Sequence, residues 1–167
     1  PFRLETVDVL KKVADYFPDD ARPWYYLGNL LYDKQPGKAI EAWEKCVRLD
    51  PSLAIAHRNL GWGYYHYTGD GLKAIQEYEK AMAIKKDDPL YFEELDALYE
   101  MSNAPVEKRL ALFEGHNETV SARDNAFARQ ITVLTLAGKP EKAVEYLKGR
   151  KFSYREGSSK VRDIIID

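Results

Sequence analysis

The feature that most constrains this 167-residue chain is a repeat of about 34 residues. Large ring side chains recur in steps of 33, 35 and 35 positions, at Trp24, His57, Phe92 and Phe127. Three positions further on, the first three copies carry leucine and the fourth carries glutamine: Leu27, Leu60, Leu95 and Gln130. A period of this length is typical of solenoids, in which no repeat buries its apolar face without its neighbours.

A second series of large side chains lies about 19 positions after the first, at Trp43, Tyr78, Phe113 and Leu147. Small residues precede three of its members by four positions: Ala39, Ala74 and Ala143. Gly28 and Gly61 follow the first two leucines. Small side chains at these places let two helix backbones approach closely, and the large rings then fill the wedges between neighbouring pairs.

These residues resemble the tetratricopeptide-repeat family over most of the chain. The first copy carries Trp24, Leu27, Gly28, Leu31, Ala39, Trp43 and Pro51; the second carries His57, Leu60, Gly61, Tyr64, Ala74, Tyr78 and Ala81. The third copy departs from the pattern at Asp96 and Arg109, and the fourth at Gln130 and Ile131. The resemblance implies an all-α fold, a right-handed α-α superhelix of about four helix pairs plus partial terminal helices.

Capping and turn signals agree with that division. Asp19-Asp20 and Asp87-Asp88 are N-cap candidates. We predict helices over about 3–16, 21–33, 37–49, 54–67, 71–84, 89–101, 105–115, 120–137 and 140–149. We expect one domain over 1–167, a fragment of a longer chain, with a partial repeat over 1–18, repeats over about 19–51, 52–86, 87–120 and 121–153, and the start of a further helix over 158–167.

Composition limits the partners. The 25 basic and 27 acidic residues are interspersed and the net charge is -2, so no basic stripe predicts nucleic-acid binding. No apolar run approaches the roughly 20 residues that span a bilayer, so we expect no membrane partner. The single cysteine, Cys46, excludes an intramolecular disulfide and is expected to be a buried small hydrophobe. Cytoplasm is the expected compartment, and the apolar C-terminal end allows a dimer to form through it.

The sequence predicts no catalytic, metal or cofactor site. His57 and His66 lie nine positions apart, on opposite faces of one predicted helix, so they form no metal site, and His57 is expected to pack as a wedge ring. The run Glu93, Glu94, Asp96 and Glu100 suggests paired carboxylates, but a solvated or groove-facing helix surface is the favoured interpretation. We therefore predict that the chain is not an enzyme.

The candidate binding site is the concave groove that the first helix of each pair lines in a tetratricopeptide array. By register, the groove residues are Arg22, Tyr25, Asn29, Tyr32, Arg58, Asn59, Trp62, Tyr65, His66 and Glu93. Tyrosine, tryptophan and arginine dominate binding hot spots, so this face predicts a peptide or protein ligand. The alternative is that the aromatic residues pack against a neighbouring domain or a later repeat.

One binding mode of the family does not fit this sequence. Cochaperone members hold a C-terminal carboxylate with a clamp of two Asn, two Lys and an Arg. Asn29 and Asn59 match the two asparagines, but Tyr25 and Leu90 stand at the lysine positions and Glu94 at the arginine position. Because Glu94 would repel a carboxylate, we expect no clamp of this kind.

Short runs over 26–32, 57–61, 94–99 and 150–157 are similar to one group of large bacterial proteins. In that group an uncharacterised β-sandwich-rich domain precedes a tetratricopeptide array. The resemblance implies a bacterial origin and a link to carbohydrate handling that belongs to the upstream domain. The two functions that remain open are a non-catalytic scaffold that binds a peptide, a partner domain or its own upstream domain, and a structural spacer or dimerisation arm of a larger enzyme.

Overall fold

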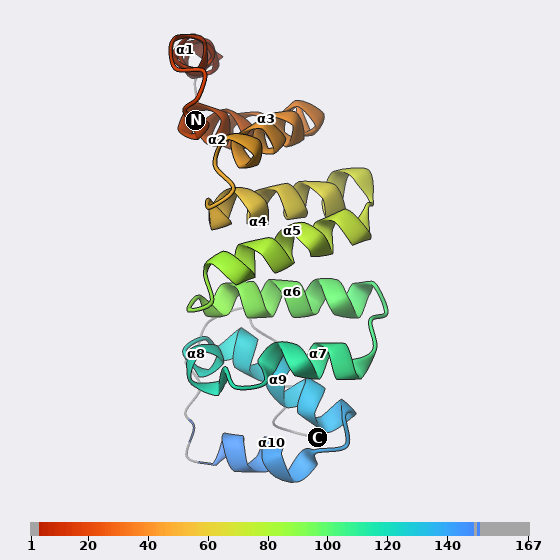
Figure 1. The fold of residues 1–167 in the computed structure, drawn as a ribbon. Helices are drawn as coiled ribbons and strands as arrows, with labels where there is room; N and C mark the ends of the chain where they lie inside the picture. The colour runs from red at the N-terminus through yellow and green to blue at the C-terminus, as the bar shows by residue number, and fades with distance from the viewer. Residues whose placement is uncertain (1–3, 149, 151–167) are drawn as a thin grey trace. The chain divides into compact units, whose positions relative to one another are not determined.

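The computed structural model of this protein describes residues 4–148 and Arg150, and every regular element in that part of the chain is a helix. The chain divides into two compact units, 1–85 and 86–167 (Figure 1). The first unit contains α1 (Leu4–Tyr16), α2 (Ala21–Leu31), α3 (Pro36–Leu49), α4 (Ala54–Gly63), the π-helix η1 (Tyr64–Thr68) and α5 (Gly71–Ile84). The second contains α6 (Pro89–Met101), α7 (Val106–Phe113), α8 (Asn117–Ser121), α9 (Asp124–Leu136) and α10 (Pro140–Leu147).

Aspartate side chains start three of these helices. Asp20, Asp70 and Asp88 are the N-caps of α2, α5 and α6, and each carboxylate accepts a hydrogen bond from a backbone N–H in the first turn. This satisfies a donor that has no partner inside the helix. The predictions at Asp20 and Asp88 are therefore confirmed, whereas the cap at Asp70 was not predicted.

The core of the first unit forms where α2, α3 and α4 meet. Leu27, Trp43 and Leu60 are buried in one cluster there. Gly28 lies so close to the Trp43 indole that a Cβ added at position 28 would be 2.3 Å from Nε1. In the next helix pair, a Cβ at Gly61 would be 2.6 Å from the Tyr78 ring. The two glycines thus have the packing role that the repeat pattern predicted.

In the third copy of the repeat, which belongs to the second unit, a buried ion pair takes the place of this packing of small residues. Asp96 and Arg109 stand where other copies carry a glycine and an alanine. Asp96 is completely buried, and it accepts two hydrogen bonds from Arg109, at 2.8 and 2.9 Å. Arg129 on α9 adds a third, at 2.6 Å. The expectation that the acidic run forms a solvated or groove-facing surface is therefore wrong for Asp96, because two arginines compensate its burial.

Other parts of the second unit's core match the pattern. Phe92 and Phe127, the ring residues of the third and fourth copies, are fully buried, and α6 packs directly against α9. Val120 and Val133 complete the apolar interior. The ring residues Phe92 on α6 and Phe127 on α9 therefore both lie in the interior of the second unit, as the repeat pattern predicted.

Most predicted helices agree with the structure to within one or two residues at each end, and two of them differ by more. The predicted helix over 120–137 is divided into α8 and α9, because Arg123 has an extended backbone (φ −133°, ψ 121°) and precedes α9 as its N-cap residue. The predicted helix over 54–67 changes from α4 into the π-helix η1 at Tyr64. The predicted helix over 158–167 and the end of the fourth repeat lie outside the described residues.

Candidate functional site

Four predicted groove residues come together on one side of the first unit, and we call them the aromatic face: Tyr32, Trp62, Tyr65 and His66. The Trp62 indole is close enough to the Tyr32 hydroxyl to lower its pKa, so α4 lies beside Tyr32, the residue that follows α2. The ring centroid of Trp62 lies 3.9 Å from that of His66, which in turn lies 5.0 Å from that of Tyr65. Trp62 remains 42% exposed, so this cluster presents ring surface to solvent.

The π-helix supplies half of the aromatic face. Tyr65 and His66 both belong to η1, in which Gly69 closes the turn in the left-handed conformation (φ 71°) and donates its N–H to the carbonyl of Tyr64. Single π-helical turns inside α-helices occur often at functional sites. The sequence predicted the glycine turn at this place but not the π-helix.

Polar side chains continue this surface toward α3. Oδ1 of Asn29 accepts hydrogen bonds from Nε1 of Trp43 at 3.1 Å and from Nδ2 of Asn59 at 2.9 Å. Arg58 extends toward Oδ1 of Asn59, 3.4 Å away. The two asparagines, 30 positions apart, therefore form a polar strip that connects consecutive repeats.

Tyr32 joins the aromatic face to the core. Its ring centroid lies 5.4 Å from that of the buried Trp43. Burial raises the pKa of the Tyr32 hydroxyl, the nearby Trp62 indole partly offsets that rise, and the charge of Asp33 adds to it. The hydroxyl therefore stays protonated at neutral pH and is available as a hydrogen-bond donor.

Three other predicted groove residues have their own contacts outside this cluster. Arg22 is bound to the cap residue Asp20 through both guanidinium and backbone. Tyr25 packs edge-to-face on Tyr26, with centroids 5.2 Å apart. Glu93 belongs to the second unit, where it accepts hydrogen bonds from Arg123 and, at 3.1 Å, from Asn125.

His57 is buried, as predicted, but it also makes specific polar contacts. Its Nε2 lies 3.0 Å from the carbonyl of Pro51, which can only accept, and its Nδ1 lies 2.6 Å from Oε2 of Glu77. Burial acts to raise the pKa of Glu77, but hydrogen bonds from His57 and Lys80 outweigh it and lower the pKa. The ring therefore fastens α4 to α5 and to the preceding turn.

The groups most suited to chemistry are arranged for packing. Cys46 is completely buried, and burial, with the charges of Asp50 and Asp20, raises the pKa of its thiol to about 11. A thiol of this kind is a poor nucleophile at neutral pH. Within residues 4–148, no three His, Cys, Asp or Glu side chains gather in the geometry of a metal site. No helix of that part combines the length and apolar character needed to cross a bilayer.

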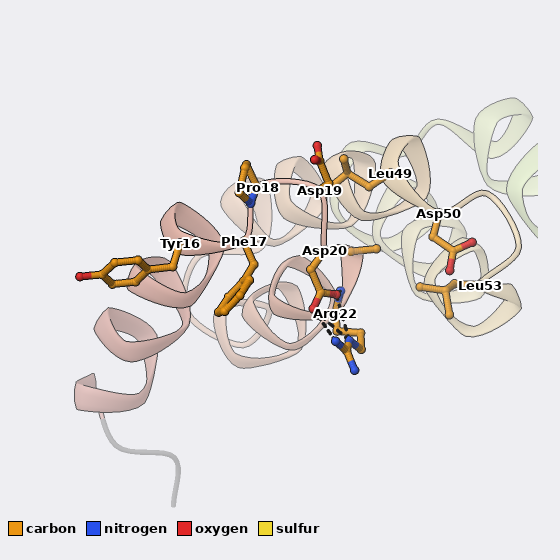
Figure 2. Close-up of a pocket in the computed structure, with 10 residues that line it drawn as sticks. Tyr16, Phe17, Pro18, Asp19, Asp20, Arg22, Leu49, Asp50 and Leu53 are labelled. Atoms are coloured by element: carbon orange, nitrogen blue, oxygen red, sulfur yellow. Dashed lines mark hydrogen bonds and ion pairs between the residues drawn. The ribbon is translucent and has the colours of Figure 1, made fainter.

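A pocket of about 720 Å³, which shares no lining residue with the aromatic face, lies at the turns that join α1 to α2 and α3 to α4. Exposed Tyr16 and Phe17 border it on the α1 side, as Figure 2 shows. In the same view Arg22 turns toward Asp20, and Asp50 lies at the far side. No pattern in the sequence predicted this pocket, because most of its walls come from turn residues and helix ends, which follow no helical period.

Comparison with known proteins identifies the fold. No model of a known protein family matches the sequence. A crystal structure of MamA is similar, with a TM-score of 0.68 and 23% identity over 85% of this chain and 82% of that one. MamA 41-end from Desulfovibrio magneticus RS-1 is also similar, with a TM-score of 0.65 and 16% identity over 95% of this chain and 83% of that one. Because MamA has a tetratricopeptide-type fold, this all-α chain has a tetratricopeptide-like helical-repeat fold, as the sequence predicted.

Proposed function

We propose that this chain is a non-catalytic interaction module that binds a peptide or a partner domain through the aromatic face. The observation that carries the proposal is the exposed ring cluster of Tyr32, Trp62, Tyr65 and His66 beside the polar strip of Asn29 and Asn59. The aromatic rings would supply buried contact area. The amides would bind the backbone of an extended ligand.

The side chains of the face suit a binding surface because their positions are already restrained. The Trp62 ring is in contact with the His66 ring, with centroids 3.9 Å apart, so a ligand would order few additional torsions. Restrained aromatic side chains lose little conformational entropy on binding, and tryptophan and tyrosine are enriched at hot spots. Because Trp62 is 42% exposed, its apolar ring surface is in contact with water. A bound partner would remove that unfavourable contact.

A displayed library of random peptides tests this proposal even though the partner is unidentified. Peptides selected on the wild-type chain should bind Trp62→Ala and His66→Ala at least tenfold more weakly, because a hot-spot truncation costs about 2 kcal/mol or more. Leu72→Ala is the matched control, since Leu72 is 77% exposed on α5 and outside the face. Helical content and melting temperature of each variant show that the fold is retained.

The alternative function is a structural spacer or dimerisation arm of a larger bacterial enzyme that handles carbohydrate, located in the cytoplasm. If that alternative holds, either the library yields no selected peptide or the selected peptides bind Trp62→Ala as well as they bind the wild type. Both results contradict the interaction module. If the partner is an upstream domain that docks on the aromatic face, Trp62→Ala and His66→Ala should weaken the binding of that domain at least tenfold, as they do for the selected peptides.

A further inference from the structure

The side-chain amide of Asn29, on α2, is fixed in one orientation. Its Oδ1 accepts hydrogen bonds from Nε1 of Trp43 at 3.1 Å and from Nδ2 of Asn59 at 2.9 Å. An indole nitrogen can only donate, so the atom that faces Trp43 has to be the oxygen of the amide and not its nitrogen. Asn29 is exposed, and within the described part of the chain its Nδ2 has no acceptor. The surface therefore presents oriented N–H donors here, while both lone pairs of the amide oxygen are already used.

Tyr32 adds a further donor one turn along the chain. It follows Asn29 by three positions at the end of α2, so the two side chains are neighbours on one side of the helix. Burial raises the pKa of the Tyr32 hydroxyl, which is therefore protonated at neutral pH. No group of the described residues accepts its proton. Asn29 and Tyr32 thus form a row of hydrogen-bond donors without acceptors.

Aromatic rings lie beside this donor row. Asn59 and Trp62 are also three positions apart, on α4, and the hydrogen bond from Asn59 to Asn29 joins the two helices. The Trp62 indole lies beside the Tyr32 hydroxyl, and the His66 ring follows one turn later, with its centroid 3.9 Å from that of Trp62. Trp62 and His66 are both exposed. A ligand on the aromatic face therefore meets donors from α2 and ring surface from α4 and η1.

Donors beside rings favour a ligand that carries acceptors and apolar surface. An ordinary extended peptide brings one backbone N–H for each carbonyl, and an N–H that is buried on binding needs an acceptor. The Asn29 oxygen cannot serve, because it already accepts two hydrogen bonds. Proline brings a carbonyl without an N–H, and proline-rich segments form the polyproline II helix, which has no internal hydrogen bonds. Aromatic-lined grooves bind such segments at low entropic cost, because the conformation exists before binding.

We propose that the aromatic face binds a proline-rich segment in the polyproline II conformation. Carbonyls of the segment would accept hydrogen bonds from Nδ2 of Asn29 and from the hydroxyl of Tyr32. Its pyrrolidine rings would pack against Trp62 and His66. This inference rests on the proposed interaction function and names the class of ligand for the same face.

The test is an NMR titration of the full chain with a pair of peptides, deca-L-proline and deca-D-proline, each blocked at both ends. Deca-L-proline should cause saturable shifts of the amides of residues 29–32 and 59–66. Deca-D-proline has the same composition, hydrophobicity and acceptors but forms the helix of opposite hand. It should bind about tenfold or more weakly, because its carbonyls and rings cannot meet the donors and the aromatic rings together.

Asn29→Asp gives the sharpest variant. The carboxylate still accepts from Trp43 and Asn59, but an oxygen that repels a carbonyl replaces the N–H donors, so binding of deca-L-proline should weaken about tenfold or more. Tyr32→Phe keeps the ring and removes the hydroxyl, and it should weaken binding about two- to tenfold. Gln76→Glu is the control, since it makes the same change from amide to carboxylate at an exposed position on α5 and should leave binding unchanged. Helical content and melting temperature show that each variant is folded.

Three results would overturn the proposal: no saturable shifts with deca-L-proline, equal binding of the two mirror-image peptides, or unchanged binding by Asn29→Asp. The displayed library separates such a failure from failure of the proposed function. If the library yields peptides without prolines whose binding depends on Trp62, the interaction module stands and only the ligand class is wrong. If it yields no peptide that depends on Trp62, and deca-L-proline does not bind, both proposals fail.

Discussion

At the scale of single residues, a missing side chain can matter as much as one that is present. Gly28 faces the Trp43 indole, and Trp43 also donates to Asn29 on the surface that carries the aromatic face. The glycine therefore positions a ring that connects the core with the candidate site. The sequence pattern predicts the need for a small residue at position 28, but the indole it accommodates is known only from the packing.

Gly28→Ala should destabilise the first unit by about 1–3 kcal/mol, because the new Cβ would lie 2.3 Å from Nε1 of Trp43 and would displace the ring. Chemical unfolding monitored by tryptophan fluorescence measures the loss. Gly37→Ala is the control: its Cβ would meet the Tyr67 ring at an ordinary 3.6 Å, so the change in stability should be small or favourable. Equal effects of the two substitutions would contradict the packing argument.

At the scale of elements, the second unit is joined by charge across α6, α7 and α9. Asp96 binds Arg109 and Arg129, and the same two arginines also reach Glu100, at 3.2 Å in each case. Sequence comparison between the repeats marks Asp96 and Arg109 only as departures from the pattern. The structure shows that the two departures compensate each other.

Asp96→Ala should cost about 3–5 kcal/mol, because it leaves the buried Arg109 without its main partner. The double variant Asp96→Ala with Arg109→Met should recover at least half of that loss, since it removes the uncompensated charge and keeps apolar volume. Free energies of unfolding for the wild type, both single variants and the double variant give the coupling directly. Additive losses would show that the pair is not coupled.

At the scale of the whole molecule, favourable electrostatics depend on ionised carboxylates in both units. In the first unit the pKa values of Asp20, Asp50 and Asp70 are lowered, mainly by hydrogen bonds to their side chains. At Glu77 and at Glu100, in the second unit, burial opposes ionisation, but the neighbouring basic groups prevail and the pKa is lowered. A lowered folded-state pKa stabilises the fold above the ordinary pKa of about 4, and this stabilisation is lost as the pH falls.

The chain should therefore lose stability between about pH 5 and pH 2. Glu77→Gln tests one contribution: at pH 7 it should lower the free energy of unfolding by about 1–3 kcal/mol, and the difference from wild type should shrink by pH 3. Urea unfolding at the two pH values measures it. Glu41→Gln is the control, because Glu41 is exposed and forms no ion pair within the described part. A difference for Glu77→Gln that stays constant with pH would exclude this contribution.

Local patterns along the chain were enough to specify the helical class, the period of the repeat and most helix boundaries. The register of the repeat also predicted Tyr32, Trp62, Tyr65 and His66 as residues of one groove, whereas helix boundaries follow from periodicity and capping, which act over a few neighbouring residues. Contacts between distant segments determine which polar groups are buried and where the pockets lie, and the local patterns did not predict either. Asp96 is buried only because Arg109 and Arg129 reach it from other helices, and Gln130 lines a pocket that three helices form. Burial of a polar group depends on partners far away in the chain, and no local period encodes them.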